Sequence, residues 1–373
     1  MSVVFRTDAS IQIGTGHVMR CLTLANELAR QGSECWFVCR AHPGNLGQII
    51  KSEGHHLILL PAPQSLPSEK EFNSVSADYA SWLGVSWQED ARQTLEAISS
   101  LKPDWLVVDH YALDSNWEGS LASAVGDIMV IDDLANRPHA CGLLLDQNLG
   151  RVASDYGGLL ASECQQLIGP SFALLRPEFA ALRGQSLERR KAPEIKRILI
   201  SLGGIDRSNV TGQVLQALAR SSLPASTTMD IIMGAAAPHL DDVRRQAAQL
   251  QFKTTVSVNV KDMAKRMCLA DLSIGAVGGT SWERCCLGLP VIALVLADNQ
   301  RNSAAALSRH GVAVIVKNSE AIRLAVDRFA DEGTALCYLF FMSYAGAQLV
   351  DGNGCKRVTR YLLEKMPRKL SDY

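Results

Sequence analysis

The chain has 373 residues, of which 47% are hydrophobic and 20% are charged. This length exceeds what one hydrophobic core ordinarily supports, so we predict two globular domains. The formal net charge of −1 provides no broad basic field for nucleic acid or an anionic lipid surface. The first residues lack the basic start and apolar core of a signal peptide, and no apolar run reaches transmembrane length. We therefore expect a cytoplasmic protein without a nucleic-acid or membrane partner.

The ten cysteines are scattered singly, apart from the adjacent Cys285 and Cys286. None has C-x-x-C spacing, and no histidine pair lies beside them at the spacing of zinc ligands. This pattern favours small buried thiols over a metal site.

The first half of the chain alternates apolar strands with helices. Residues 18–30 carry apolar side chains at helical spacing, and Gly32 is placed to end that helix. Continuous apolar strands separated by helices indicate a parallel sheet that is covered on both faces. The expected strands are residues 3–6, 35–39, 57–60, 105–109 and 127–132.

A second series of strands and helices follows a charged stretch at 183–194, which is the best candidate for a linker. Residues 61–86 contain three prolines and several serines, and we interpret them as a surface excursion. The fold class is therefore α/β, with two Rossmann-like domains whose strand ends face a common cleft. The second set of strands is expected at 197–202, 229–233, 271–274, 291–295 and 312–316. The predicted domains are 1–185, 195–334, and a helical tail at 335–373 that packs across their junction.

A glycine-rich segment joins the first strand to the first helix. Gly14 and Gly16 would let the backbone approach a ligand, and the helix start favours an anion. The segment lacks the third glycine of a dinucleotide fingerprint and the Gly-Lys-Ser/Thr of a P-loop. His17 is its distinguishing residue, with Arg20 one turn later, although His17 could instead be a helix cap or a satisfied polar group.

A second glycine-rich segment, at 276–290, also runs from a strand into a helix. Its backbone N–H groups and hydroxyls are suited to a diphosphate, and the carboxylate of Glu283 is suited to the two ribose hydroxyls. The alternative is that Glu283 and Thr280 only form a capping box. The expected diphosphate contacts are Gly278, Gly279, Thr280 and Ser281.

Polar side chains also follow two strands of the first domain. Asp109, His110 and Tyr111 end one strand, and the pair at 132–133 ends the next. Each is either a ligand contact or a helix cap or turn-former. Arg176 could pair with a phosphate, or it could be a surface arginine before a proline turn.

Taken together, these segments resemble one known family, the UDP-2,4-diacetamido-2,4,6-trideoxy-β-L-altropyranose hydrolases of pseudaminic acid synthesis. The resemblance extends over nearly the whole chain. The matching motifs are R-x-D-A-S-x-Q-I-G-x-G-H-x-x-R-C-L-x-L-A at 6–25, V-D-H-Y at 108–111, I-D-D-L-A-x-R at 131–137, L-R-P-E-F at 175–179, I-S-L-G-G at 200–204, G-G-T-S-W-E-R-C-C-L-G-L-P at 278–290, A-D-N-Q at 297–300 and V-D-G-x-G at 350–354.

The resemblance implies a fold like that of the B-type glycosyltransferases, with no metal and no cofactor. It implies a UDP-sugar substrate, and a product that leads to glycans of bacterial flagellin or other surfaces. His17 matches the family's catalytic histidine, Arg176 and Glu283 match substrate-binding positions, and Tyr111 is a further catalytic candidate. The motifs also place Gly204 and Asn299 among the substrate contacts, whereas Val277 stands where a smaller residue is expected. We expect a monomer or a weak homo-oligomer.

A mechanism fits these residues. A departing phosphate, with a second pKa of roughly 6, needs little protonation, so the two carboxylates of ordinary glycosidases are not required. An imidazole, with an ordinary pKa of about 6.5, suits a general base. We therefore predict that His17 takes a proton from water, which attacks the anomeric carbon with inversion. The rival interpretations are a glycosyltransferase that uses the same donor and a non-catalytic nucleotide-sugar-binding protein.

Overall fold

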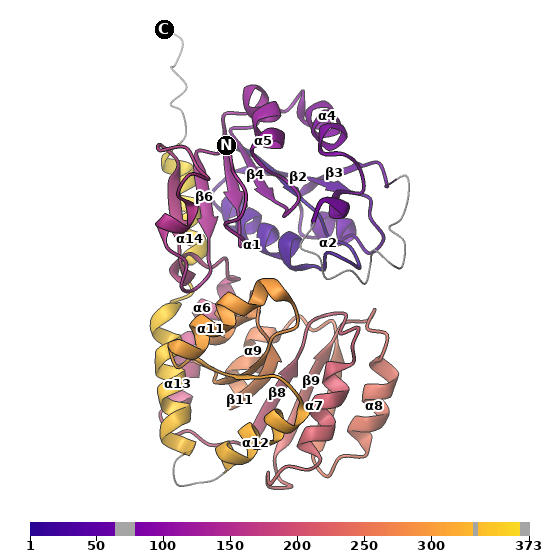
Figure 1. Cartoon of the computed structure of the whole chain (residues 1–373), viewed down its shortest axis with the longest axis vertical. Coiled ribbons are helices and arrows are strands. Elements are labelled where there is room, and N and C mark those ends of the chain that lie inside the picture. Colours follow the sequence, from indigo (N-terminus) through magenta and orange to yellow (C-terminus); the bar gives the residue numbers. More distant parts are fainter. Residues whose placement is uncertain (64–78, 331–334, 366–373) are drawn as a thin grey trace. The chain divides into compact units, whose positions relative to one another are not determined.

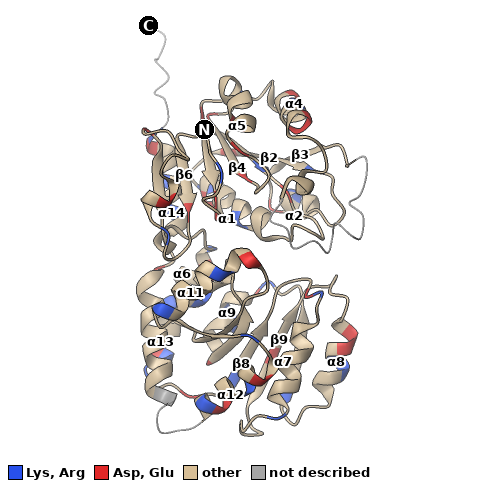
Figure 2. Ribbon diagram, in the orientation of Figure 1, with Lys and Arg blue, Asp and Glu red and all other residues tan. Residues whose placement is uncertain are grey.

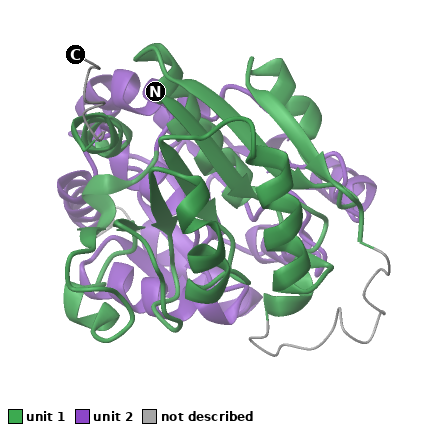
Figure 3. Cartoon of the chain, turned by 90° about the horizontal axis from the view of Figure 1, so that it is seen from above, with its two compact units in different colours: residues 1–174, 354–373 green, residues 175–353 purple. Residues whose placement is uncertain are grey.

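The computed structural model describes residues 1–63, 79–330 and 335–365. The chain divides into two compact units. The first comprises residues 1–174 together with 354–373, and the second comprises residues 175–353 (Figure 3).

The first unit is built on a seven-stranded, all-parallel sheet (Figure 1). Its strand order, β3-β2-β1-β4-β5-β6-β7, is that of a doubly wound fold in which the chain reverses direction beside β1. The strands are β1 Ser2–Thr7, β2 Glu34–Arg40, β3 His56–Leu60, β4 Trp105–Asp109, β5 Asp127–Ile131, β6 Leu143–Asp146 and β7 Gln165–Ile168.

Helices cover both faces of this sheet because successive side chains of each strand point to opposite sides. Val3 and Phe5 pack in one core with apolar residues of α1 (Gly16–Arg30) and α14 (Gly354–Glu364). Val4 lies in a separate core with residues of α4 (Trp87–Ile98) and α5 (Ser115–Leu121). The short helix α2 (Gly47–Ser52) contacts β3.

The second unit contains a six-stranded, all-parallel sheet in the order β10-β9-β8-β11-β12-β13. Its strands are β8 Arg197–Ser201, β9 Thr228–Met233, β10 Lys253–Val258, β11 Leu272–Ala276, β12 Val291–Leu294 and β13 Ala313–Val316. Its helices are α6 Pro177–Arg189, α7 Val210–Leu218, α8 Leu240–Ala248, α9 Met263–Leu269, α10 Thr280–Cys286, α11 Arg301–Arg309, α12 Ser319–Ala330 and α13 Ala335–Leu349.

These sheets confirm the predicted class, two α/β domains with parallel sheets. Each predicted strand is present within a residue or two, and Gly32 ends α1 with a positive φ of 83°. The sequence prediction missed β6, β7 and β10. The last two are edge strands rich in polar residues, so neither shows the continuous apolar run that marked the central strands.

The charged stretch at 183–194 is not a linker between the compact units. Its first seven residues complete α6, where Ser186 is buried. Arg190 is also buried, and its guanidinium donates to the carbonyls of Met267, Ala270 and Gly288. The division into units falls instead between Leu174 and residue 175, and again after residue 353. The two helices of the predicted tail therefore belong to different units, with α13 in the second and α14 in the first.

Acidic and basic residues are interspersed on the outer helices (Figure 2). On α8, for example, Asp241 pairs with Arg244 and Asp242 with Arg245. In the ranges that the structure describes, no helix combines the length and the apolar character needed to cross a membrane. Most of the predicted excursion at 61–86, residues 64–78, lies outside the described ranges.

Candidate active site

The polar residues of the first unit gather where its sheet reverses direction. β1 and β4 are neighbours there, and the helices that follow them lie on opposite faces. The loop after β1 leads into α1, which carries His17 and Arg20, and Asp109 is the last residue of β4. A switch point of this kind leaves an opening at the carboxyl ends of the strands, which is the usual ligand site in open α/β sheets.

His17 is oriented by Asp109. Its Nδ1 lies 2.6 Å from Asp109 Oδ1, and the Asp109 side chain is completely buried. Because an ionised carboxylate can only accept, the hydrogen of a neutral His17 imidazole is on Nδ1, and Nε2 keeps its lone pair. The helix-cap alternative is not observed, since the N-cap of α1 is Thr15 and no side-chain bond caps it.

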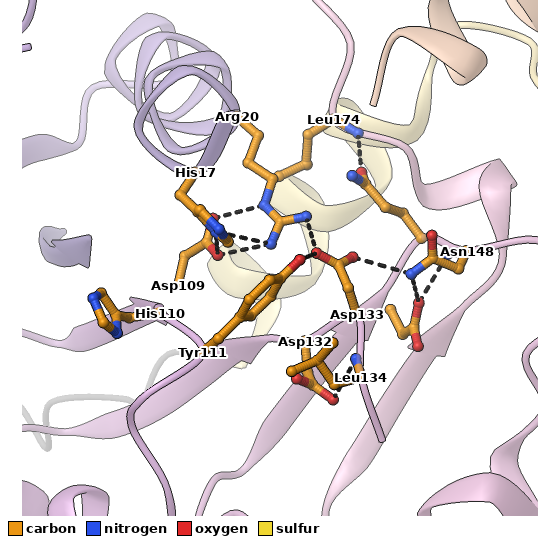
Figure 4. Close-up of polar contacts among 12 residues, drawn as sticks. His17, Arg20, Asp109, His110, Tyr111, Asp132, Asp133, Leu134, Asn148 and Leu174 are labelled. Atoms are coloured by element: carbon orange, nitrogen blue, oxygen red, sulfur yellow. Dashed lines mark hydrogen bonds and ion pairs between the residues drawn. The ribbon is translucent and has the colours of Figure 1, made fainter. Parts of the chain in front are cut away.

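Arg20 holds the same carboxylate from a second side. Its Nε donates to Asp109 Oδ2 at 2.6 Å and its Nη2 to Oδ1 at 2.7 Å, while Nη1 donates to Asp133 at 2.7 Å (Figure 4). Burial alone would raise the pKa of Asp109, but the charges of Arg20 and His17 outweigh it and hold that pKa well below its usual range. Asp109 is therefore ionised throughout the neutral range.

Tyr111 completes this cluster. Its ring lies edge-on to the His17 imidazole, with 4.6 Å between centroids, and its hydroxyl donates to Asp133 at 2.7 Å. Burial, reinforced by the charge of Asp133, raises the pKa of Tyr111 well above its usual value, so the phenol keeps its proton. Asn148, on the loop after β6, donates to the other oxygen of Asp133 at 3.1 Å. Figure 4 shows these side chains converging from α1, β4 and the loops after β5 and β6.

His110 faces away from this cluster (Figure 4). Its Nδ1 accepts from the backbone of Ala112, and its Nε2 lies 3.5 Å from Asp8. Asp8 in turn pairs with Arg6 at 2.8 Å, in a fully buried network that includes Asp90. Burial lowers the pKa of His110 to about 3, even though Asp8 opposes the shift, so this imidazole is neutral at physiological pH.

In the second unit, the glycine-rich segments follow β8 and β11, which are neighbours at the point where that sheet reverses. A Cβ atom built on Gly204, Gly278 or Gly279 would meet nothing within 4 Å, so the protein's own packing does not require glycine there. Ser281 is buried and its hydroxyl accepts from the Gly278 backbone at 3.3 Å. These glycines leave the backbone open to close approach by a ligand.

Arg176 and Glu283 lie together in this unit, although 107 positions separate them in the chain. Arg176 is the N-cap residue of α6, and its guanidinium lies 3.1 Å from Glu178 and 3.7 Å from Glu283. Burial raises the pKa of Glu283 to about 7, against the opposing charges of Arg176 and Arg284.

The capping-box alternative for Glu283 is not observed. α10 has Gly279 as its N-cap and no side-chain cap bond, so Thr280 is the first residue of the helix. The Thr280 hydroxyl accepts from Arg284 at 3.0 Å. Glu283 therefore contacts Arg176 rather than closing the start of its own helix.

The structure places the predicted residues in two groups. The first unit brings together His17, Arg20, Asp109 and Tyr111, close to Gly14 and Gly16, which lie in the loop and at the start of α1. The second unit brings together Arg176 and Glu283, and Asn299 is exposed on the turn after β12. Asp133, one of the pair considered at 132–133, joins the first group through Arg20 and Tyr111, and Asn148 is a site residue that the prediction omitted. The I-D-D motif was a signal for Asp133, whereas nothing in the sequence singled out Asn148.

Solved structures with the same architecture are B-type glycosyltransferase-like proteins. MurG of Acinetobacter baumannii matches with a TM-score of 0.68 at 16% identity, covering 97% of this chain and 99% of that one. CalG4, a calicheamicin glycosyltransferase, matches with a TM-score of 0.61 at 16% identity, covering 98% and 99%. The protein therefore has the fold of the B-type glycosyltransferases, with its polar clusters at the carboxyl ends of both sheets.

No family model matches the chain. Over 318 residues it is 26% identical to the UDP-2,4-diacetamido-2,4,6-trideoxy-β-L-altropyranose hydrolase of Campylobacter jejuni, covering 85% of this chain and all of that protein. It is also 30% identical over 197 residues to the spore coat polysaccharide biosynthesis protein SpsG of Bacillus subtilis, covering 52% of this chain and 57% of that protein. The similarity to the Campylobacter hydrolase extends over most of the chain and supports the family that the motifs indicated.

Proposed function

We propose that this protein is an enzyme that acts on a UDP-sugar, and that it hydrolyses UDP-2,4-diacetamido-2,4,6-trideoxy-β-L-altropyranose. The observation that carries the proposal is the pairing of His17 with the buried Asp109 at the switch point of the first sheet, in a chain similar to the Campylobacter hydrolase over most of its length. The free sugar would then serve pseudaminic acid synthesis in the cytoplasm and, later, glycans of flagellin or other surfaces.

The reaction follows from the His17 tautomer. Nε2 of the neutral imidazole accepts a proton from water as the water oxygen attacks the anomeric carbon. The bond from that carbon to the β-phosphate oxygen breaks, and its electron pair leaves with UDP. Asp109 then stabilises the imidazolium, as the carboxylate of a hydrolytic triad does. Because the leaving phosphate is weakly basic, the reaction needs no separate acid at the leaving oxygen.

In this proposal the second unit binds the UDP part of the substrate. The backbone N–H groups at Gly278 and Gly279 would bind the diphosphate, and the guanidinium of Arg176 would offset its charge. The carboxylate of Glu283 would accept hydrogen bonds from the two ribose hydroxyls. Arg20 and Asp109 were predicted to contact the substrate. The burial of Asp109 favours instead a role in which Asp109, held by Arg20, orients His17.

A glycosyltransferase is the second candidate, because solved structures with this fold include a glycosyltransferase. It would use an acceptor hydroxyl where the hydrolase uses water. Purified protein incubated with the UDP-sugar and no acceptor separates the two. Prompt release of UDP and of the free sugar, followed by NMR, supports the hydrolase, whereas release that depends on an added acceptor supports the transferase.

Hydrolysis in ¹⁸O-water should place the label on the C1 hydroxyl of the sugar, because attack at carbon is the route that a base beside the sugar assists. The first-formed anomer should have inverted configuration. Mass spectrometry of UDP and of the sugar, with NMR taken early in the reaction, measures both. Label in UDP would instead mean attack at the β-phosphorus, and would move His17 to the phosphate side of the bond.

UDP affinity should rise as the pH increases from 6 to 8, because Glu283 loses its proton near pH 7 and only the carboxylate accepts from both ribose hydroxyls. Glu283→Gln should weaken UDP binding at pH 8 and remove this part of the pH dependence. Calorimetric titration at several pH values measures the UDP affinity of the wild type and of the variant. The protonation of UDP contributes equally to both, so the difference between them reports on Glu283.

The matched control is Glu178→Gln, since Glu178 contacts the same guanidinium but is more exposed. It should leave both UDP affinity and its pH dependence near those of the wild type. Equal UDP affinity of the wild type and the Glu283→Gln variant at pH 8 would exclude the ribose contact.

A further inference from the structure

An aromatic cluster adjoins His17 and is not explained by the hydrolytic chemistry alone. Tyr79 and Trp82 lie on a short 3-10 helix, η1 (Tyr79–Leu83), in the described last part of the excursion at 61–86. The Trp82 ring stacks on Tyr111 with 5.6 Å between centroids and an interplanar angle of 26°. It also lies edge-on to the imidazole of His17, at 6.2 Å.

Tyr79 closes the cluster on another side. Its ring lies 4.8 Å from that of Trp82 and 5.0 Å from that of Tyr111, both in edge-on geometry. The imidazole of His17 therefore has a carboxylate on its Nδ1 side and two aromatic rings, those of Tyr111 and Trp82, in edge-on geometry beside it. Trp82 and Tyr79 are only half-buried, whereas Tyr111 and His17 are buried.

The aromatic rings beside His17 are suited to a sugar that carries apolar substituents. Ligand sites are typically apolar and aromatic with a few placed polar groups, and a half-buried tryptophan supplies a large, rigid apolar face at small entropic cost. A sugar that carries N-acetyl methyl groups and a deoxy carbon presents far more apolar surface than a fully hydroxylated one. An aromatic face beside the general base would favour the former and would also exclude bulk water from the imidazole.

We propose that Trp82 is a specificity-determining residue that packs against the apolar, N-acylated face of the sugar in the UDP-sugar substrate. This inference rests on the proposed function, because it takes the sugar to lie beside His17. Tyr79 supports Trp82 by its edge-on contact, and Tyr111, which is itself held by its bond to Asp133, stacks on the Trp82 ring.

A purely structural role makes a different prediction. If Trp82 only covers Tyr111, then its truncation lowers thermal stability and disturbs His17, which changes kcat and leaves sugar affinity unaltered. If Trp82 contacts the sugar, then its truncation weakens binding of the intact UDP-sugar and leaves binding of UDP unaltered. Affinity for these two ligands therefore separates the roles.

The experiment measures Kd by calorimetry for UDP and for the intact UDP-diacetamido sugar, in the His17→Asn background so that turnover does not interfere. Trp82→Ala should weaken binding of the UDP-sugar about tenfold, which corresponds to about 1.4 kcal/mol, and should leave the Kd of UDP within about twofold. Trp82→Phe should restore most of the loss. Trp87→Ala, which removes a more exposed tryptophan from α4, is the control and should change neither Kd.

Equal Kd values for the UDP-sugar with and without Trp82, or equal weakening of both ligands, would overturn the inference. The proposed function is measured separately, by turnover of the same sugar by the wild-type protein. Binding that depends on Trp82 without turnover would overturn the hydrolase and keep the aromatic contact. Turnover of the sugar, combined with a sugar affinity that does not depend on Trp82, would keep the hydrolase and overturn the aromatic contact.

Discussion

Replacement of His17 by asparagine should lower turnover of the UDP-sugar by about 100-fold or more, the usual lower scale for losing a general base. The amide can still donate a hydrogen bond to Asp109, as Nδ1 of the imidazole does. It cannot take up the proton that the attacking water must lose. The affinity for UDP should stay within about twofold, because the residues proposed to bind UDP belong to the second unit.

The measurement is kcat for UDP release, with calorimetric titration of UDP on the same preparation. His239→Asn is the matched control, because His239 lies at the start of α8 in the other unit, where it is partly exposed. It should leave kcat unchanged. Normal turnover by the His17→Asn variant would remove His17 from the mechanism. An equal loss of kcat in the His239→Asn variant would show that the loss does not come from removing the general base.

The sheets could be predicted from the sequence because their central strands are buried on both faces. Residues of β1 and β4 are almost all fully buried, which produces the continuous apolar runs that marked them. The edge strand β10 begins with three polar residues and has only exposed or half-buried positions, so its sequence is also compatible with a loop. The charged stretch at 183–194 was wrongly predicted to be a linker. Its first residues complete α6, and Arg183 and Arg190 donate to backbone carbonyls of the second unit.

The site was predictable as far as strand ends and glycines could place it. A histidine after the first strand and an aspartate at the end of the fourth must meet at one edge of a parallel sheet, and they do so at 2.6 Å. Their exact partnership was not predictable, since Asp109 could equally have pointed at a ligand. The position of Trp82 beside the site could not be predicted from the sequence, because Trp82 belongs to an irregular segment whose position depends on tertiary packing rather than on periodicity.

Asp109→Asn should lower kcat by about 100-fold or more while changing UDP affinity little, because Asp109 acts through the tautomer of His17. The ionised carboxylate accepts the hydrogen on Nδ1, so Nε2 is free to act as the base. An asparagine amide turned toward the ring donates to Nδ1 instead, which places the proton on Nε2. The analogous change in a serine protease triad costs about 10⁴-fold in kcat for this reason.

Titration of Asp109 itself should add no pH dependence to this loss between pH 5 and pH 9, since the pKa of Asp109 lies well below its usual range and the wild-type carboxylate stays ionised throughout. ¹⁵N NMR of the imidazole gives a readout that a purely structural role would not move: Nδ1 should carry the proton in the wild type and Nε2 in the variant. Asp133→Asn is the matched control, because it removes the other partner of Arg20 but leaves the contact between His17 and Asp109. It should keep the wild-type tautomer and lose far less activity. An unchanged tautomer in the Asp109→Asn variant, with full turnover, would show that the proton position on His17 does not depend on this carboxylate.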